Sequence, residues 1–230
     1  MAIFTSGPTV GQISGRIGGS IFSHNRGGPY MRNGTIPTKA TSAAAMDAKS
    51  RLAAASMAWQ GLDTDTMLAW NAYAVQNPAI NRLGNKISLT GHQTFVGNFC
   101  RCDRAGVSTL TLPPVAESPD ALKTLTLNLD VGAGLFDVTY TVTPMAASLH
   151  LWLKACVTQS LGVSYYQNLM KLISVTPAAQ VSPYDFQDDL EDRWGTLQVG
   201  HGVAVDAFVF DSATGLISAP RRAIGVTVTT

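Results

Sequence analysis

The first 39 residues are interrupted so often by glycine and proline that no apolar run within them could form a hydrophobic core. This segment has no acidic side chain, and its basic residues are Arg16, Arg26, Arg32 and Lys39. A segment folds by itself only if the apolar surface that it buries offsets the conformational entropy that it loses. We therefore predict that residues 1–39 form an extended docking arm, which becomes ordered on contact with neighbouring subunits.

Apolar and β-type residues recur between the glycines of this arm. The run from Gly11 to Ser23 is expected to lie extended, with Ile13, Ile17 and Phe22 as separated anchors. The sequence Asn-Arg-Gly-Gly at 25–28 is typical of a tight turn and predicts a short hairpin. The assembly contacts that this pattern predicts are Ile13, Arg16, Ile17, Phe22, Arg26, Tyr30 and Arg32.

The composition of the 230-residue chain favours a globular protein with a largely covered surface. It is 46% hydrophobic and only 13% charged, which suits a protein whose partners cover much of its surface. No run approaches 18 apolar residues, and the N-terminus has no continuous apolar stretch of the signal-peptide type. The expected compartment is therefore cytosol-like, at least initially. Three cysteines are an odd number and do not indicate a disulfide framework.

The charges are distributed asymmetrically along the chain. Residues 1–104 contain ten Lys or Arg and four Asp or Glu, whereas residues 105–230 contain six and eleven. This asymmetry favours subunits that pack a basic surface against an acidic one. Nucleic acid is the other acidic partner that we considered, but we expect it less because the basic residues are spread thinly along the chain.

An alanine-rich stretch follows the arm and predicts a unit of three short helices over residues 40–106. Thr41 or Ser42 is expected to cap a helix over 42–60, and Asp63 or Thr64 a second helix to about Ala74. A third helix is expected over 91–104. The first helix is expected to bury one face, comprising Ala45, the stem of Lys49, Leu52, Ala55 and Trp59. Trp59 and Trp70, both facing inward, would hold the first two helices together.

A series of spaced motifs resembles a group of uncharacterised proteins encoded by tailed bacteriophages and prophages. The motifs are Ser14-Gly15-x-Ile17-Gly18-Gly19, Asn25-Arg26-Gly27-Gly28-x-Tyr30-x-Arg32, Ile36-Pro37-Thr38, Trp59-x-x-Leu62, Trp70-x-x-Tyr73-Ala74 and Leu89-Thr90-Gly91-x-x-x-Phe95-Val96. The resemblance covers roughly residues 11–105. The genes of this group lie among virion structural genes, so the resemblance implies a component of a virus particle.

The second half of the chain changes to a period of two. Apolar residues alternate through 125–129, 136–142, 149–157 and 203–209, and glycines and prolines separate these runs. About seven strands in roughly 115 residues predict an all-β immunoglobulin-like sandwich over 123–230, joined through a linker at 107–122. The stretch from Phe208 to Pro220 looks like the last hairpin of a fibronectin type III module. The fold class that we predict is therefore α+β and multi-domain, with an arm and hairpin, a three-helix unit and a sandwich.

Three patterns could carry chemistry. His92, Cys100 and Cys102 form the one grouping with metal-ligating residue types, but Cys-x-Cys on a helix points its thiols far apart, so we predict no metal site. The acidic run 185–192 lacks the spacing of a calcium loop and is expected to be a solvated loop or an acidic patch that meets a basic arm. The run Gly15-x-x-Gly18-Gly19 lacks the strand and helix that a phosphate-binding loop needs. Cys156 is expected to be a structural thiol.

These observations predict a non-enzymatic virion structural protein of a tailed bacteriophage, without a cofactor and assembled in the host cytoplasm. Its expected partners are capsid or tail subunits and copies of itself, with no membrane involved. A capsid cement or decoration protein is favoured over a tail or baseplate component. The alternative is an adhesin module for a host receptor or carbohydrate, for which Tyr165, Tyr166, Tyr184 and Trp194 are the candidate contacts.

Overall fold

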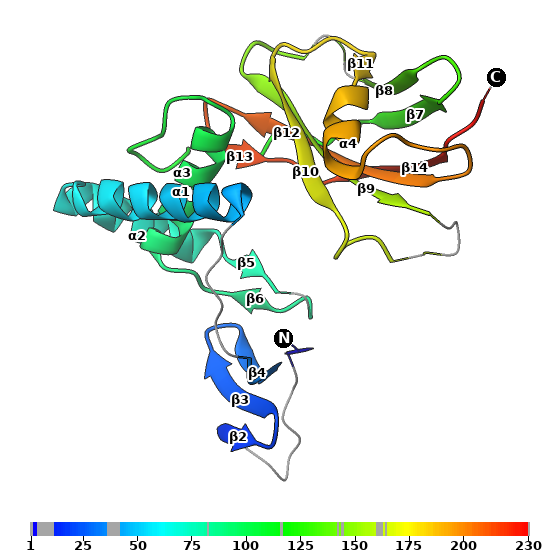
Figure 1. Ribbon diagram of the computed structural model, residues 1–230. Helices are drawn as coiled ribbons and strands as arrows, with labels where there is room; N and C mark the ends of the chain where they lie inside the picture. The colour runs from blue at the N-terminus through cyan, green and yellow to red at the C-terminus, as the bar shows by residue number, and fades with distance from the viewer. Residues whose placement is uncertain are drawn as a thin grey trace. The chain divides into compact units, whose positions relative to one another are not determined.

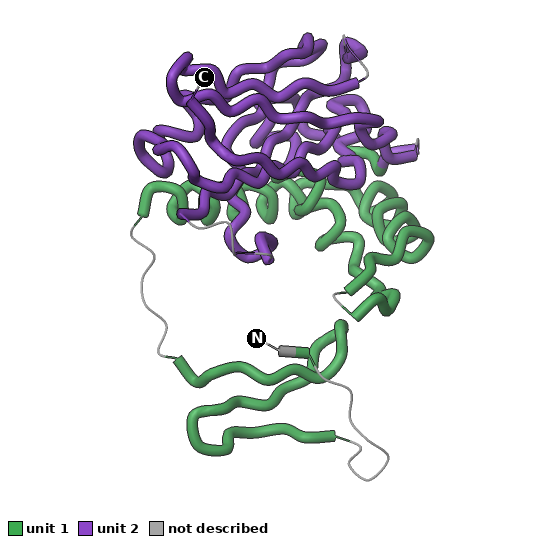
Figure 2. Tube along the Cα trace, turned by 90° about the vertical axis from the view of Figure 1, so that its right-hand side faces the viewer, with its two compact units in different colours: residues 1–100, 111–113 green, residues 101–110, 114–230 purple. Residues whose placement is uncertain are grey.

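The computed structural model describes residues 2–3, 12–35, 42–81, 83–115, 117–141, 143, 145–159, 163 and 165–229. These residues form a mixed α and β structure with four α-helices and several antiparallel sheets (Figure 1). The chain divides into two compact units, shown in Figure 2. One unit comprises Met1–Cys100 and Thr111–Pro113, and the other comprises Arg101–Leu110 and Pro114–Thr230.

Four short strands form an antiparallel sheet at the N-terminus, which we call the arm sheet. The strands are β1 (Ala2–Ile3), β2 (Gly15–Ile17), β3 (Ser20–Asn25) and β4 (Gly28–Asn33), in the order β1-β4-β3-β2. The hairpin predicted at 25–28 is confirmed, and its turn is closed by a 2.8 Å hydrogen bond from the Gly27 amide to Asn25 Oδ1.

The prediction that Gly11 to Ser23 lies extended is wrong. The chain reverses between Ile17 and Ser20, which pair directly with each other, so β2 returns against β3. The two intervening residues form the turn, and Gly18 has a φ of 57°, a conformation that glycine adopts without steric cost.

Three helices follow in the first unit, close to the predicted positions. They are α1 (Ala43–Gln60), α2 (Thr64–Gln76) and α3 (Gly91–Arg104), and a short hairpin of β5 (Ala79–Ile80) and β6 (Lys86–Ile87) lies between the last two. Ser42 and Asp63 cap α1 and α2 by accepting backbone hydrogen bonds, as predicted. No helix in the described ranges is both long and apolar enough to span a membrane.

The core of the helical region is built from aromatic rings. Phe95 of α3 contacts both tryptophans, with ring centroids 5.5 Å from Trp59 and 5.4 Å from Trp70. Trp70 is completely buried, and its indole Nε1 donates a 2.6 Å hydrogen bond to the carbonyl of Thr111. Phe95 therefore joins the two tryptophans that we expected to hold the first two helices together.

The predicted buried face of α1 is only partly correct. Ala55 is buried and Trp59 is half-buried, but Lys49 is exposed and 54% of the Leu52 surface is accessible. The helix carries apolar residues on several sides, so its periodicity alone does not identify the buried face.

The second unit is built around two antiparallel sheets. One has the order β11-β8-β7, from β7 (Thr124–Asp130), β8 (Leu135–Thr141) and β11 (Tyr184–Asp185). The other has the order β10-β9-β12-β13, with β14 also paired to β12. Its strands are β9 (Leu149–Thr158), β10 (Lys171–Ala178), β12 (Gly202–Asp211), β13 (Leu216–Ile217) and β14 (Arg221–Val226).

One hydrophobic core includes residues from both of these sheets. Its members include Leu129, Phe136 and Val138 from the smaller sheet and Leu151, Val205 and Val209 from the larger one. The period-two pattern predicted these inward residues. On the opposite face of the larger sheet, Cys156 is buried against Ala204 and Tyr166, as expected of a structural thiol.

The second half of the chain is not all-β, because the acidic run forms a helix and not the predicted loop. Helix α4 spans Gln187–Trp194, and its residue Leu190 is fully buried in the core. Trp194, four residues later, packs against the same core. Asp188 and Asp189 lie in the first turn, where their negative charges stabilise the helix by interacting with its dipole. Part of the predicted linker is also packed, since Pro114 and Leu122 are buried.

Candidate assembly surface

The arm sheet has no buried residue among those that the structure describes in it. Every described side chain from Gln12 to Thr35 is at least partly exposed, and 69% of the Ile17 surface and 37% of the Met31 surface are accessible. A sheet normally buries at least one face against another layer. Both faces of the arm sheet are therefore available to a partner.

The strand register places apolar side chains on one face, which we call the apolar face. Phe22 pairs with Met31 on one side and with Gly15 on the other, and directly paired residues project to the same face. Ile17 projects to this face as well, because it lies two residues from Gly15 along β2. No Lys, Arg, Asp or Glu lies at a described paired position on this face.

The opposite face, which we call the basic face, carries two arginines in one row. Ile21 of β3 pairs with Arg16 of β2 on one side and with Arg32 of β4 on the other. The neighbouring row contains Ser23, Tyr30 and Ile3. Arg16 donates a 2.9 Å hydrogen bond from Nε to the carbonyl of Gly18, which holds it over its own hairpin.

The structure separates the predicted contacts into three groups. Ile17 and Phe22 lie on the apolar face, whereas Arg16, Tyr30 and Arg32 lie on the basic face. Ile13 precedes β2 and is half-buried, and Arg26 occupies the exposed β3–β4 turn. Sequence reasoning missed Ile21 and Met31, which alternation along two strands joined by a two-residue turn could have identified.

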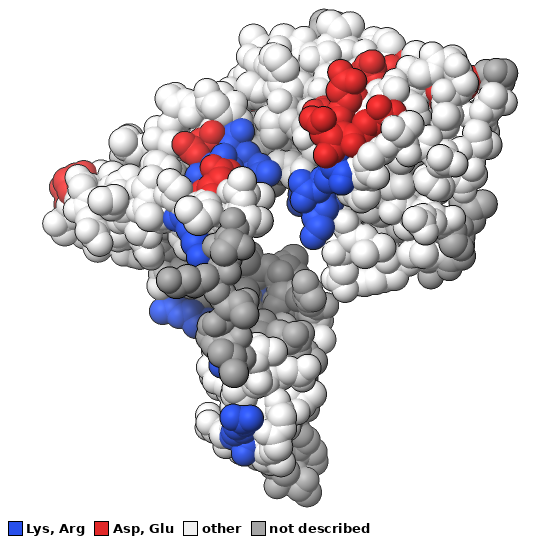
Figure 3. Space-filling model, in the orientation of Figure 1, with Lys and Arg blue, Asp and Glu red and all other residues white. Residues whose placement is uncertain are grey.

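A concentration of acidic side chains lies on α4 and the residues just before it. Figure 3 shows these carboxylates gathered on the surface over α4. Asp185, Asp188 and Asp192 are exposed, whereas Asp189 accepts a 3.3 Å hydrogen bond from the hydroxyl of Tyr184. Within the described part of the chain, no group of three or more His, Cys, Asp or Glu side chains is arranged to hold a metal ion.

Two buried thiols and His92 are used in packing. Burial raises the pKa of the Cys102 thiol, and it also raises the pKa of the Cys156 thiol. Both thiols are therefore kept protonated at neutral pH, and a thiol is a much weaker nucleophile than a thiolate. His92 lies against Trp59, with ring centroids 5.5 Å apart, and Cys100 is half-buried.

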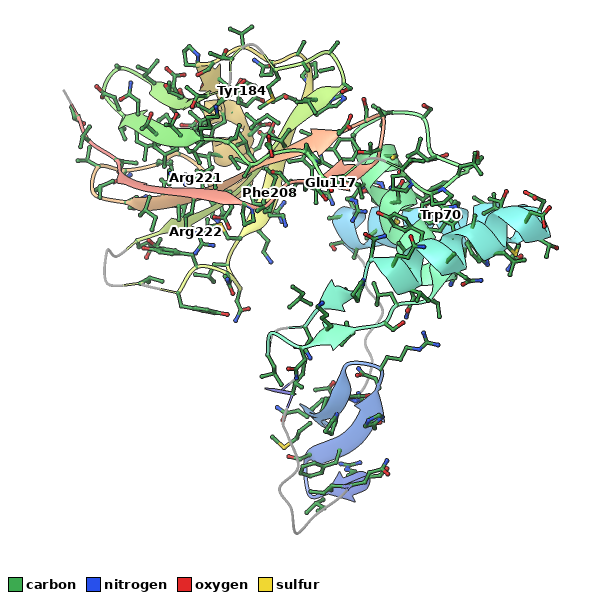
Figure 4. The ribbon with its side chains drawn as sticks, turned by 180° about the vertical axis from the view of Figure 1, so that it is seen from behind. Trp70, Glu117, Tyr184, Phe208, Arg221 and Arg222 are labelled. Carbon is green, nitrogen blue, oxygen red and sulfur yellow. The ribbon has the colours of Figure 1, made fainter. Side chains whose placement is uncertain are left out.

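The aromatics considered for ligand binding do not share a surface. Tyr166 is buried in the cluster around Cys156, and Tyr165 beside it is exposed. Tyr184, labelled in Figure 4, packs with Trp194 against the core between the sheets and hydrogen-bonds Ser174 at 2.8 Å. These residues therefore belong to two separate clusters.

The comparisons with known proteins include a weak structural similarity. No protein-family model matches the sequence, and no curated protein matches it either. Among solved structures, the chain is similar to a Fn3-like protein from Clostridium thermocellum, with 11% sequence identity and a TM-score of 0.30. The match covers 50% of this chain and 96% of the other.

Proposed function

We propose that this protein is a non-enzymatic structural protein of a tailed-bacteriophage virion, and that its arm sheet anchors it to neighbouring capsid or tail subunits. A role in capsid cement or decoration is preferred to one in the tail or baseplate. The observation that carries the proposal is the arm sheet without a buried residue among its described positions. Such a sheet becomes stable when a partner covers its faces.

The motif resemblance supports a particle component, because the proteins that share these motifs are encoded among virion structural genes. The motifs include the turn glycines of the arm and the residues Trp59, Trp70 and Phe95 that form the aromatic core. The same sequence positions therefore build both the arm and the helical region beside it.

We further propose that the second unit is an immunoglobulin-like domain of the fibronectin type III class. Support comes from two antiparallel sheets that contribute to one core and from the β12–β13 hairpin near its end. In this proposal the second unit faces outward on the particle, and the arm supplies the attachment. Binding of many symmetric copies would compensate for the entropic cost of ordering each arm.

The mechanism proposed for attachment is addition of a strand to a neighbouring sheet together with burial of the apolar face. Strand β2 is the last strand in the described order of the arm sheet, and it pairs with β3 alone. Its outer edge can hydrogen-bond another strand. Ile17, Phe22 and Met31 would then bury apolar surface against the partner.

Deletion of residues 1–39 tests the proposal in cells that assemble the particle. The truncated protein is expected to keep the circular dichroism of its helices and strands but to be missing from purified particles. A full-length Ile17→Asp and Met31→Asp double variant should show the same loss without shortening the chain. Incorporation of both proteins at the wild-type level would show that the arm is not the anchor.

A further inference from the structure

We propose that the basic face of the arm sheet docks on helix α4 of a second copy of this protein. This inference rests on the proposed function, because it names the partner of the same arm. The occupant of the basic face is thus the acidic surface of another identical chain.

The arm supplies positive charge without internal compensation. Between Gln12 and Thr35 it contains Arg16, Arg26 and Arg32 and no acidic residue. All three arginines are exposed, and none has an ion pair among the described residues. Arg16 and Arg32 flank Ile21 in one row, so the two charges border an apolar side chain on the same face.

Helix α4 supplies the opposite charge. From Asp185 to Arg193 the chain has five acidic residues and one basic residue. Asp188 and Asp192 are exposed, and neither forms a hydrogen bond or ion pair through its side chain with another described residue. The guanidinium of Arg193 lies over the ring of Trp194, 5.9 Å from its centroid. The free carboxylates therefore form a surface that Arg16 and Arg32 would complement.

The spacing of the charges on the two surfaces is compatible. Arg16 and Arg32 are separated by two strand intervals, which is about 10 Å between their backbones. Asp188 and Asp192 lie one turn apart, about 6 Å along the helix axis. Asp185, the last residue of β11, lies two residues before α4 and adds a third exposed carboxylate to this surface, so two long arginine side chains can each reach a carboxylate.

A contact between the arm of one copy and α4 of the next joins two different surfaces. Such a heterologous contact leaves one arm and one helix free at the ends of any open chain of subunits. It therefore generates either a closed ring or a continuing array. Both products suit a protein that is placed in many copies around a particle.

Charge reversal in the purified full-length protein tests the inference. Variant A carries Arg16→Glu and Arg32→Glu, and variant B carries Asp188→Lys and Asp192→Lys. Matched controls with equal charge change are Lys49→Glu with Lys86→Glu for A, and Glu117→Lys with Asp120→Lys for B. Arg16 and Arg32 are exposed. The six substituted positions outside the arm are exposed as well, namely Lys49, Lys86, Glu117, Asp120, Asp188 and Asp192. Sedimentation velocity measures self-association at about 50 mM and about 500 mM salt, where screening differs strongly.

The wild type is expected to associate more weakly at the higher salt concentration. Variants A and B should each self-associate about tenfold or more weakly than the wild type, whereas both controls should behave as the wild type does. A mixture of A and B should restore association, because the acidic arm of A faces the basic helix of B while the unchanged basic arm of B faces the unchanged acidic helix of A. Failure of the mixture to form even a one-to-one complex would overturn the inference.

Two other results would also overturn the inference. One is a wild type that stays monomeric at every concentration, and the other is equal loss in the variants and their controls. If arm deletion abolishes incorporation into particles but variants A and B self-associate normally, only the inferred docking on α4 is refuted. In that case the proposed function stands and the arm binds a different virion protein.

Discussion

The amide of Gly91 donates a 3.0 Å hydrogen bond to the side-chain oxygen of Asn71. This bond joins the first residue of α3 to the middle of α2. A β-carbon at position 91 would lie 2.6 Å from the backbone nitrogen of Asn71 and 2.8 Å from the carbonyl carbon of Trp70. The two helices can therefore approach this closely only because position 91 has no side chain.

Gly91→Ala is expected to destabilise the helical region by about 1–3 kcal/mol, since backbone atoms must move to admit the methyl group. Hydrogen exchange of the α2 and α3 amides measures the effect. Gly61→Ala is the control, because a β-carbon there would meet its nearest atom at an ordinary 3.6 Å. Equal protection of these amides from hydrogen exchange in the two variants would contradict the close-packing explanation.

Ile17→Asp is expected to leave the thermal stability of the purified protein nearly unchanged, within about 0.5 kcal/mol. Ile17 is 69% exposed and belongs to a sheet without a buried residue among its described positions. Val205→Asp provides the contrast, because Val205 is fully buried between the sheets. Thermal denaturation followed by circular dichroism compares the two variants. A large loss of thermal stability in Ile17→Asp would mean that the arm sheet has a core in the free protein.

Arg222→Ala is expected to lower the free energy of unfolding by about 3–5 kcal/mol, because it leaves a buried carboxylate without its partner. Arg222 on β14 and Asp206 on β12 form a two-pronged ion pair, with Nε–Oδ1 at 2.6 Å and Nη2–Oδ2 at 2.7 Å. The side chain of Asp206 is 9% exposed and that of Arg222 is 35% exposed. Figure 4 labels Arg222 and its neighbour Arg221.

Asp206→Ala should cost less than Arg222→Ala, since the remaining guanidinium can be hydrated. Urea denaturation of the two variants gives the comparison. Arg221→Ala removes an exposed arginine at the next position and serves as the control. A larger decrease in the free energy of unfolding for Asp206→Ala than for Arg222→Ala would contradict this order.

Tyr140 is expected to make the protein less stable at alkaline pH. Burial raises the pKa of Tyr140 to about 12, and its hydroxyl donates a 3.0 Å hydrogen bond to the carbonyl of Gln180. The unfolded chain therefore loses this proton first, near pH 10. The contribution of Tyr140 to the free energy of unfolding should be constant below about pH 10 and fall by roughly 1.4 kcal/mol per pH unit toward pH 12.

Tyr140→Phe should remove this part of the alkaline decline, at a cost of about 1 kcal/mol at neutral pH for the lost hydrogen bond. Burial also raises the pKa of Tyr184, but Tyr184 is present in both proteins. The difference between their urea midpoints across the alkaline range therefore isolates Tyr140. Parallel pH profiles for the two proteins would show that Tyr140 does not contribute.

The positions of most helices and strands were predictable from the sequence, because the signals that specify them are local. Ser42 and Asp63 cap helices by bonding amides three residues away, and the alternation of Val203, Val205 and Val209 follows from the strand period of two. The hairpin at 25–28 was predictable for the same reason. Helix α4 was missed because its apolar face has few residues, chiefly Leu190 and Trp194, within an acidic run.

Which side chains share a face could not be predicted, because it depends on strand register and on packing in the folded chain. The paired positions of β2, β3 and β4 place Arg16 and Arg32 on either side of Ile21 and separate Phe22 from Tyr30. A shift of one residue in either two-residue turn would move every side chain of a strand to the other face. Likewise, the burial of Ala55 and the exposure of Leu52 depend on the packing partners of α1, which residues far apart in the sequence supply.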